Sequence, residues 1–374
     1  MIKIKSVKIF YLELPLDNPV KTSFGTMFSR PCLLVSLIDK TNQIGLGEIW
    51  CNFPKQGSEY RFNILNELIL NLLINKEFEE PGLLINFLDE KIKTMFVQSG
   101  DMGSYHNILS GLDCAIWDLF SKNKNMPLNK LFNKNSKNFI KIYASGINPH
   151  EWLDKVNYAR SLGVHAFKIK IGFNNSLDER LISDLDDNIK NNEFYMLDSN
   201  QGWKFENAKL FLKKLETSKA KWIEEPISAL HSYKKILKLS KYSNSQLAFG
   251  ENIYNIDIFV KLASYDKISF LQPDLTKYGG ISFLNLLQNK IENKKIWLHF
   301  LGCGVGLITS AHMQTVINNN AYLEMDINEN PLRDEIFTEK IKIVDGKILL
   351  NEKPGLGFEL NESIINKYLI LSNV

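Results

Sequence analysis

Short apolar runs recur through the middle of this 374-residue chain about every 25 residues, and a polar side chain closes nearly every run. A strand, a helix and two short loops take about that length, so each period fits one βα unit of a parallel sheet. The segments between the runs carry apolar residues at helical spacing, as expected for helices that cover a sheet. Eight such units predict an α/β fold, a (β/α)8 TIM-like barrel whose active site lies at the carboxyl ends of the strands. The eight runs are 141–145, 166–171, 194–198, 221–224, 247–250, 268–272, 296–299 and 321–325.

Both ends of the chain depart from this period. Residues 1–60 alternate apolar and polar side chains like an antiparallel meander, and residues 104–133 have helical periodicity. The tail, residues 341–374, returns to short strand-like runs. We therefore predict an α+β capping domain formed by the N-terminal region and the C-terminal tail. The predicted division is 1–134 for the N-terminal capping domain, 135–335 for the barrel catalytic domain and 336–374 for the tail that completes the capping domain.

Three acidic residues close three successive runs of the barrel: Asp198 in FYMLDSN, Glu224 in KWIEEP and Glu251 in LAFGEN. Their spacings of 26 and 27 residues place them on adjacent parallel strands, where the carboxylates converge and repel one another. A divalent cation offsets that repulsion, and a set of oxygen ligands favours Mg²⁺ over zinc. The alternative is that each acid is a solvated strand-end residue, which is harder to sustain for three acids in register.

Two lysines stand one unit before these acids, Lys168 and Lys170 in AFKIKIG. Residues two apart on a strand face the same side, so both ammonium groups point into the barrel mouth. Their repulsion predicts a lowered pKa for one of the pair, which frees a lysine to act as a base. The alternative is a pair of exposed lysines, which is common in a lysine-rich chain. The same geometry directs Asp198 and Asn200 to one side, as a metal ligand and an amide donor.

A second base is predicted at His299 in IWLHF, on a strand well apart from the lysines around the ring. Asp274, in FLQPDL, ends the neighbouring strand and can fix the tautomer of the imidazole and raise its basicity. A histidine on an apolar strand is often structural, but the position beside Asp274 favours a functional one. Glu324 closes the eighth run and can, when protonated, donate a hydrogen bond to a substrate oxygen. Such a mouth suits abstraction of the proton α to a carboxylate, with cations stabilising the enolate (aci-carboxylate) that forms.

Composition narrows the class of protein. The formal net charge of +3 is small for this length and the lysines are scattered over helix faces, which disfavours nucleic-acid binding. No apolar run reaches 18 residues and the N-terminus lacks the layout of a signal peptide, so no membrane association is expected. The four cysteines form no paired motif, as in a reduced cytoplasmic protein. We expect a small-molecule carboxylate as the substrate and a homo-oligomer as the assembly.

Several segments together resemble the enolase superfamily, and within it the mandelate racemase subgroup of the mandelate racemase/muconate lactonizing enzyme family. They are FKIKIG, LDSNQGW, WIEEP, FGEN, QPDLTKYGG, LHF and LEMD, with LSGLDCAIWDL and PGLGFE in the capping domain. The resemblance covers essentially the whole chain. It implies an enzyme in which Asp198, Glu224 and Glu251 bind Mg²⁺ as the cofactor.

The same resemblance implies roles for the remaining polar residues of the mouth. Lys170 is one base, and His299 with Asp274 is the other. Glu324 is the electrophile, and Lys168 assists at the substrate carboxylate. A lysine at position 274 would instead resemble the muconate lactonizing subgroup.

By analogy with that superfamily, two N-terminal loops at about 20–30 and 50–58 close over the substrate. The alternative is that their aromatic side chains only pack the interface between the domains. Aromatic tips also predict an apolar lid, which is unfavourable for a highly hydroxylated sugar diacid. The predicted substrate contacts are Ser23, Phe24, Trp50 and Asn52 in these loops and Lys168 and Asn200 in the barrel.

Two reactions share the same first step. In a dehydratase, a lyase acting on an acid sugar or related hydroxy acid, the conjugate acid of His299 helps a β-hydroxyl to leave. In a racemase or epimerase of a 2-hydroxy acid or related carboxylate, an isomerase, the second base returns a proton to the opposite face. The resemblance favours the dehydratase. A non-catalytic, metal-stabilised binding barrel is the remaining alternative, and it would not require Lys170 and His299 together.

Overall fold

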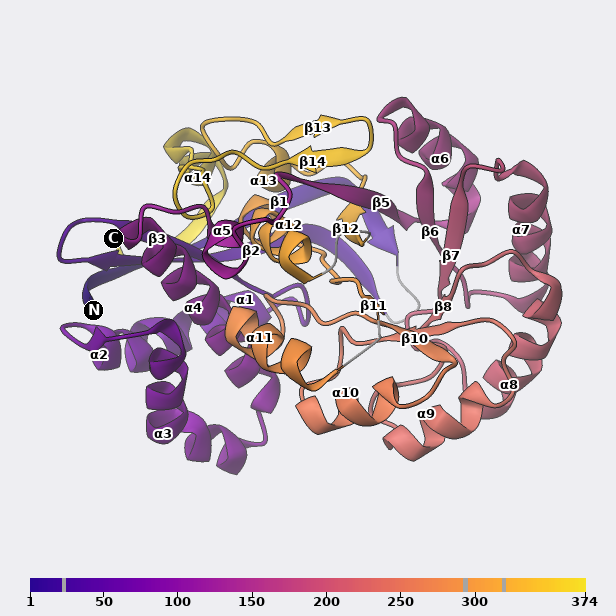
Figure 1. The fold of residues 1–374 in the computed structure, drawn as a ribbon, viewed down its shortest axis with the longest axis horizontal. Helices are drawn as coiled ribbons and strands as arrows, with labels where there is room; N and C mark the ends of the chain where they lie inside the picture. The colour runs from indigo at the N-terminus through magenta and orange to yellow at the C-terminus, as the bar shows by residue number, and fades with distance from the viewer. Residues whose placement is uncertain (22–24, 292–294, 318–320) are drawn as a thin grey trace.

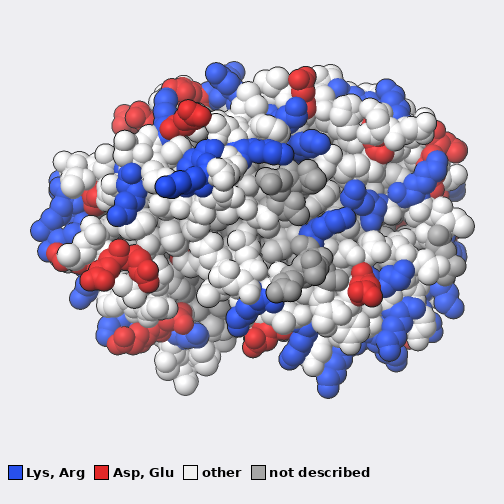
Figure 2. Space-filling model, viewed as in Figure 1, with Lys and Arg blue, Asp and Glu red and all other residues white. Residues whose placement is uncertain are grey.

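The structure is a computed structural model that describes residues 1–21, 25–291, 295–317 and 321–374. Figure 1 shows two adjoining parts: the N-terminal third, in indigo and purple, lies on one side, and helices from the middle of the chain surround the barrel strands on the other. Basic and acidic side chains are interspersed on the face shown in Figure 2. Within the described residues, no helix is both long enough and apolar enough to cross a membrane.

The capping part is built on a five-stranded antiparallel sheet in the order β15-β1-β2-β3, with β4 also paired to β1. Because β15 comes from the C-terminal end of the chain, both ends contribute to this sheet, as predicted. The strands are β1 (Ile2–Lys21), β2 (Thr26–Asp39), β3 (Ile44–Ile49), β4 (Glu77–Phe78) and β15 (Leu369–Ser372). The helices are α1 (Gly57–Asn63), α2 (Leu70–Leu73), α3 (Pro81–Ser99), α4 (Met102–Asn123) and α5 (Leu128–Phe132), with a π-helical segment at Ile64–Ile69.

Helix α4 lies directly against β3 because glycines keep both backbones bare at their contact. A Cβ atom on Gly47 would lie 2.0 Å from the carbonyl oxygen of Gly111, and one on Gly111 would lie 2.2 Å from Cγ1 of Ile49. These glycines therefore permit an approach that no larger residue would tolerate. The contact joins the strand that carries Glu48 to the helix that carries Asn107, and both of these side chains reach the barrel.

The predicted βα units form one parallel sheet in the order β11-β10-β9-β8-β7-β6-β5, with β12 paired to β5 on its other edge. Each of the eight predicted runs overlaps a strand. Among the described residues no hydrogen-bonded ladder joins β11 to β12, so the (β/α)8 barrel is open in its backbone pairing there. The strands are β5 (Phe139–Ile147), β6 (Ala166–Lys170), β7 (Phe194–Asp198), β8 (Ile223–Glu224), β9 (Leu247–Phe249), β10 (Ile268–Leu271), β11 (Lys295–Ile296) and β12 (Tyr322–Asp326).

Helices cover the outside of these strands, as Figure 1 shows. Each buries an apolar stripe against the sheet; in α6, for example, Val156 and Ala159 are fully buried at helical spacing. The helices are α6 (Trp152–Ser161), α7 (Asn175–Asn188), α8 (Phe205–Lys214), α9 (Tyr233–Ser240), α10 (Ile256–Ala263), α11 (Gly280–Lys290) and α12 (Gly304–Ile317), with 3₁₀ turns at Pro149–Glu151 and Leu215–Thr217.

Large side chains fill the barrel interior below the strand ends. The indole of Trp222 is fully buried, and its ring centroid lies 5.8 Å from that of Tyr143 and 4.5 Å from that of Phe270. Residues two apart on a strand face the same side, so five of the residues that point into the barrel have a polar residue one layer above them, nearer the carboxyl end. The pairs are Trp222 with Glu224, Phe270 with Gln272, Met196 with Asp198, Ala166 with Lys168 and Trp297 with His299. The barrel is therefore a packed core that carries a polar layer at its carboxyl end.

The tail divides between the two parts. Strands β13 (Lys342–Val344) and β14 (Lys347–Leu349) form a hairpin, and β14 pairs antiparallel with the start of β5 in the barrel sheet. The short helix α13 (Pro331–Asp334) precedes this hairpin, and α14 (Glu362–Tyr368) leads into β15 of the capping sheet. The sequence pattern predicts short strands here and places them in the capping domain with the rest of the tail, whereas β14 joins the barrel sheet, because three-residue strands do not specify a partner. The domain boundaries at 134 and 335 remain a prediction.

Candidate active site

A cavity of about 670 Å³ opens at the carboxyl ends of the barrel strands, with strand-end residues on one side and residues of the capping part on the other. This is the face on which a barrel of this kind carries its active site. Glu224 and Asp274 are buried next to residues that line the cavity. The predicted site residues that line it are Lys168, Lys170, Asp198, Asn200, Glu251, His299 and Glu324 in the barrel and Trp50 and Asn52 in the cap.

The three predicted metal ligands lie on neighbouring strands. Asp198 ends β7 and pairs in register with Glu224 of β8, while Glu251 directly follows Gly250 at the end of the β9 unit. Asp198 and Glu224 are 5% and 2% exposed. Their carboxylates offer only oxygen donors, the kind that a hard divalent cation binds. The oxygen atoms of the three residues do not all lie within 4.8 Å of one another.

Lys168 lies among these acids. Its Nζ atom is 2.7 Å from Oε1 of Glu224, 2.7 Å from Oε1 of Glu324 and 3.9 Å from Oδ2 of Asp198. The side chain is buried, so these ion pairs are little weakened by solvent. Lys168 therefore supplies part of the positive charge that offsets these carboxylates. We call Asp198, Glu224, Glu251 and Glu324 the acidic layer of the barrel mouth.

The electrostatics of this lysine narrow one expectation. Burial lowers the pKa of Lys168, but the carboxylates of Glu224 and Glu324 raise it more, and the result is a pKa well above the ordinary value. The lowered pKa predicted for one lysine of the pair is therefore not that of Lys168, because carboxylates dominate its surroundings. Lys168 remains a cation, which leaves Lys170 at the end of β6 as the candidate base.

His299 is held at both ring nitrogens. Its Nδ1 atom lies 2.8 Å from Oδ2 of Asp274, and its Nε2 atom lies 3.0 Å from Oε2 of Glu251. Asp274 is oriented in turn by Thr276, whose backbone N–H and hydroxyl both donate to its other oxygen. Burial lowers the pKa of His299, but Glu251, Glu324 and Asp274 raise it to about 10. The structure therefore brings His299 and Asp274 into the contact that the sequence predicts.

Two residues that sequence reasoning did not place in the site hold the buried acids in position. The hydroxyl of Tyr143 donates to Oε2 of Glu324 at 3.0 Å, and the amide of Gln272 donates to Oε2 of Glu224 at 2.7 Å. The indole N–H of Trp222 also donates to Oε2 of Glu224, at 3.2 Å. Tyr143 and Gln272 lie in predicted strands of the barrel. Their positions near the carboxyl ends of these strands could have identified them as neighbours of the site.

The cap contributes Trp50 and Asn52 to the cavity. The amide of Asn52 donates to the backbone carbonyl of Leu301 at 3.2 Å, which ties this loop to the barrel. Ser23 and Phe24, the other predicted lid contacts, lie outside the described residues. Which lid side chains touch a substrate remains a prediction.

The cap side of the cavity is more polar than its aromatic tips predict. The Nζ atom of Lys277 lies 4.7 Å from the ring centroid of Trp50, and Cζ of Arg61 lies 5.9 Å from it. Lys277 also lies 3.4 Å from Oε2 of Glu251 and 2.7 Å from Oδ1 of Asn252. Lys277 stands in the segment QPDLTKYGG, three residues after Asp274, whereas no motif marks Arg61 on α1.

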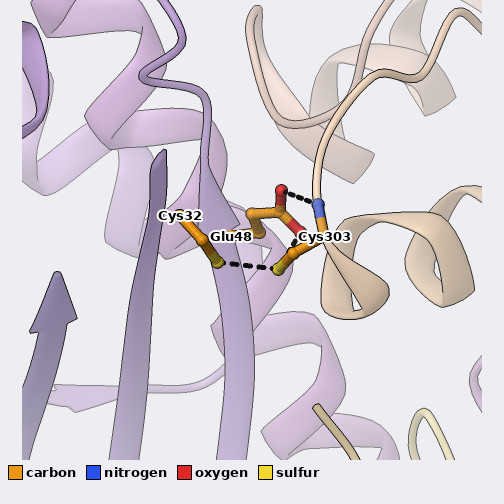
Figure 3. Close-up of side chains that lie close together, drawn as sticks. All are labelled: Cys32, Glu48 and Cys303. Carbon is orange, nitrogen blue, oxygen red and sulfur yellow. Dashed lines mark hydrogen bonds between the residues drawn. The ribbon is translucent and has the colours of Figure 1, made fainter. Parts of the chain in front are cut away.

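A buried cluster of one glutamate and two cysteines lies outside the lining of the cavity, where the cap meets the barrel (Figure 3). Glu48 of β3 accepts backbone N–H bonds from Cys303 and Gly306 at 2.7 Å each, and the thiol of Cys303 donates to it at 2.9 Å. The sulfur of Cys32 lies 2.8 Å from that of Cys303. In the described part of the chain, Cys32, Glu48 and Cys303 are the three possible metal ligands whose sulfur and carboxylate oxygen atoms lie within 4.8 Å of one another. Because the start of α12 already satisfies the carboxylate, hydrogen bonding accounts for the trio as a joint between the two parts.

Comparison with known families gives two matches that together span most of the chain. Residues 4–132 match the mandelate racemase/muconate lactonizing enzyme N-terminal domain, and residues 151–364 match the enolase C-terminal domain-like family. An arabinonate dehydratase from Saccharolobus solfataricus is 28% identical over 313 residues, which cover 81% of this chain and 82% of that protein.

Solved structures give the same picture of the fold. A mandelate racemase/muconate lactonizing enzyme from Bordetella bronchiseptica RB50 aligns with a TM-score of 0.90 at 29% identity and covers 98% of this chain and 99% of its own. An enolase from Bradyrhizobium, in complex with magnesium and mandelic acid, aligns with a TM-score of 0.83 at 25% identity and covers 99% of both chains. Both likenesses extend over the cap and the barrel together.

Proposed function

This chain belongs to the enolase superfamily, in its mandelate racemase/muconate lactonizing enzyme family, and from that premise we propose that it abstracts the proton α to a substrate carboxylate with Mg²⁺ as its cofactor. The protein is an enzyme, because that superfamily consists of lyases and isomerases. The observation that carries the proposal is the meeting of buried strand-end carboxylates with Lys170 and His299 around one cavity.

Asp198, Glu224 and Glu251 would hold the cation. They stand at the carboxyl ends of three neighbouring strands and offer only oxygen donors, which fits a hard divalent ion. The magnesium of the Bradyrhizobium enolase supports this choice of metal. When bound, the ion withdraws electron density from the substrate carboxylate and so makes the α-proton more acidic.

Lys170 and His299 would act as the two bases. Lys170 ends β6 and His299 follows β11, with four strands of the sheet between them, so they reach the cavity from different directions. Asp274 holds the Nδ1 atom of His299, so Nε2, which faces Glu251, is the nitrogen that would transfer the proton. Lys168 stays protonated and would stabilise the negative charge that develops on the carboxylate oxygens, with Glu324 beside it as the electrophile.

Dehydration of an acid sugar or related hydroxy acid is the reaction that the cavity supports best. Lys170 takes the α-proton, the β-hydroxyl leaves as water with a proton from Nε2 of His299, and the enol product tautomerises to a 2-keto acid. Asn200, Asn252 and Asn328 line the cavity with amide groups, which suit a substrate rich in hydroxyl groups. The arabinonate dehydratase relative supports this reaction class.

Racemisation or epimerisation of a 2-hydroxy acid is the second candidate. Bases on separate strands can address opposite faces of the α-carbon, so one can remove the proton and the other can return one. The mandelic acid of the Bradyrhizobium enolase, a 2-hydroxy acid without a β-hydroxyl, supports this alternative.

We also propose that the enzyme works as a homo-oligomer in the cytoplasm on a small-molecule carboxylate, without nucleic acid or a membrane. Its four cysteines are buried free thiols, which suits a reducing compartment. Light scattering on the purified protein tests the oligomer directly.

A screen in D₂O separates the two reactions. Acid sugars and 2-hydroxy acids are incubated with the Mg²⁺-loaded protein, and mass spectrometry follows both deuterium at the α-carbon and loss of water. A dehydratase forms a 2-keto acid from its substrate, whereas a racemase places deuterium in both enantiomers without losing water. Absence of α-exchange with every acid that measurably binds would contradict the proposed function.

A further inference from the structure

Arg61 places a buried positive charge on the cap side of the cavity, where the described residues give it no acidic partner. The residue is 5% exposed and lines the cavity. Within the described ranges no carboxylate lies within 4 Å of its guanidinium nitrogens. The carboxylate of Asp101 attracts the guanidinium from a greater distance. That carboxylate already accepts the backbone N–H of Ser104 at the start of α4. A buried charge is costly unless it is paired, so this side chain is disposed to bind an anion.

Neutral groups hold this guanidinium in one orientation. Nε and Nη2 donate to Oδ1 of Asn107 at 3.0 and 2.8 Å, and Nη1 donates to the carbonyl of Gly57 at 2.8 Å. Asn107 is fixed in turn because its amide donates to the backbone carbonyl of Lys277 at 2.8 Å. A guanidinium has five N–H groups, so about two have no partner in the described part of the protein. An oriented fork of this kind matches the two oxygens of a carboxylate.

Three other cations of the cavity have acidic partners in the described part of the protein. Arg30 pairs with Asp326 at 2.6 Å, Lys168 pairs with two carboxylates of the acidic layer, and Lys277 lies 3.4 Å from Glu251. Lys170 is the other lining cation that forms no ion pair in the described residues, and the proposed reaction assigns it the α-proton. Among the described residues, the charge of Arg61 is therefore neither neutralised by a carboxylate nor given a part in the proposed reaction.

Arg61 also stands apart from the reacting groups. The indole of Trp50 contacts both Arg61 and Lys277, and Lys277 in turn contacts Glu251, which lies 3.0 Å from Nε2 of His299. A carboxylate bound at the acidic layer thus leaves Arg61 free to meet a group farther along the same molecule.

From this geometry we propose that Arg61 binds a second, distal carboxylate of the substrate, so that the enzyme acts on a dicarboxylic acid. The inference rests on the proposed function, because the first carboxylate must lie at the metal for Arg61 to face the other end. It also departs from the expectation that an apolar lid is unfavourable for a highly hydroxylated sugar diacid, since the cap offers a fixed guanidinium beside its tryptophan.

Calorimetric titration of the full-length, Mg²⁺-loaded protein tests this subsite without requiring turnover. The probes are 2-hydroxyglutarate and 2-hydroxyadipate, each compared with the 2-hydroxy monocarboxylate of the same chain length. For the diacid that spans the cavity, binding should be at least about tenfold tighter than for the matching monoacid. Arg61→Gln should reduce that preference to about twofold or less, and Arg61→Lys should retain part of it. Arg180→Gln, an exposed arginine on α7, is the matched control and should leave the preference unchanged.

A second variant tests the subsite independently, in case Arg61→Gln fails to fold. Asn107→Asp places a carboxylate where the amide now accepts from Arg61, so it should neutralise the subsite and abolish the diacid preference while the guanidinium remains. Equal affinity for diacid and monoacid in the wild type, or an undiminished preference in both folded variants, would overturn the subsite. Diacid preference without α-proton exchange would instead contradict the proposed reaction, so the two failures are distinguishable.

Discussion

Two places with buried carboxylates, the joint between cap and barrel and the barrel mouth, differ in what satisfies their negative charge. At the joint between cap and barrel, both oxygens of Glu48 accept backbone N–H bonds from the start of α12. At the barrel mouth, Glu224 and Glu324 share the ammonium of Lys168, and Glu251 faces His299. Backbone donors keep their protons, whereas side-chain cations can move and exchange protons. Burial of a carboxylate therefore does not mark a reactive site by itself; ionisable partners beside a cavity do.

Two buried histidines show the same contrast. His299 lies among carboxylates, which raise its pKa to about 10. His312, within α12, has only backbone neighbours at its ring nitrogens, the N–H of Asn129 and the carbonyl of Leu356. Burial there lowers the pKa of His312 to about 4. One histidine is suited to proton transfer, and the other is suited to packing in the neutral form.

Removal of the metal should have the largest effect of the changes considered, and it should disturb the barrel mouth while leaving the joint at Glu48 unchanged. Chelation, or Glu224→Gln, should reduce turnover by at least about 10³-fold, because the charge that stabilises the enolate is lost. It should also remove the ligand-linked stabilisation, about 2.7 kcal/mol when Mg²⁺ is present at a hundred times its Kd. Thermal unfolding with and without Mg²⁺ measures the second effect. The exposed Asp187→Asn should change neither quantity, and full activity after chelation would show that the ligand assignment is wrong.

Glu48→Gln should be the next largest change, and it should affect stability more than chemistry. The amide replaces one acceptor oxygen with a donor that faces backbone N–H groups, so we expect a loss of about 2–4 kcal/mol in the free energy of unfolding. The kcat/KM of the folded fraction should fall by less than about tenfold, because Glu48 does not line the cavity. Urea denaturation and steady-state kinetics on the same sample separate the two quantities.

Cys303→Ser is the control for this change, because a hydroxyl can still donate to Glu48, and its effect on stability should be smaller. A zinc ion that co-purified with the wild type and was lost in Glu48→Gln would contradict the assignment of this cluster to hydrogen bonding.

The pH dependence of stability should show the smallest effect, from His312. Its folded pKa of about 4 is below the unfolded value of 6.5, so the unfolded chain binds more protons between these values. Stability from this residue is therefore complete above pH 6.5 and is lost as the pH falls towards 4, by about 2 kcal/mol between pH 7 and pH 5. Denaturation at both pH values, in the wild type and in His312→Gln, isolates the contribution of His312 to the free energy of unfolding. An equal loss in both proteins would contradict it.

The acidic layer could be predicted from the sequence because its signal is local. Asp198, Glu224 and Glu251 each end an apolar run, and the period places such ends on one face of the barrel. The surroundings of Lys168 could not be predicted in the same way, because Lys170 is its neighbour in sequence whereas Glu324 is its neighbour in space.

The joint and the distal subsite depend on contacts that leave no sequence pattern. Glu48 stands in an ordinary alternating strand, and its partners lie 255 residues or more away. Arg61 has no acidic partner among the described residues, and the folded structure alone reveals this because the residue stands in no sequence motif. The lid residues Ser23 and Phe24 lie outside the described residues, so their assignment stays a prediction.

The central claim is that Lys170 and His299 transfer protons at opposite faces of one α-carbon, and deuterium exchange in the two single variants tests it most directly. In D₂O, His299→Asn should lose turnover by about 10²–10⁴-fold yet still exchange the α-proton of one substrate enantiomer through Lys170. Lys170→Ala should exchange only the other enantiomer, through His299. Proton NMR of each enantiomer follows the loss of the α-signal. Near wild-type turnover in both variants would contradict the two-base account.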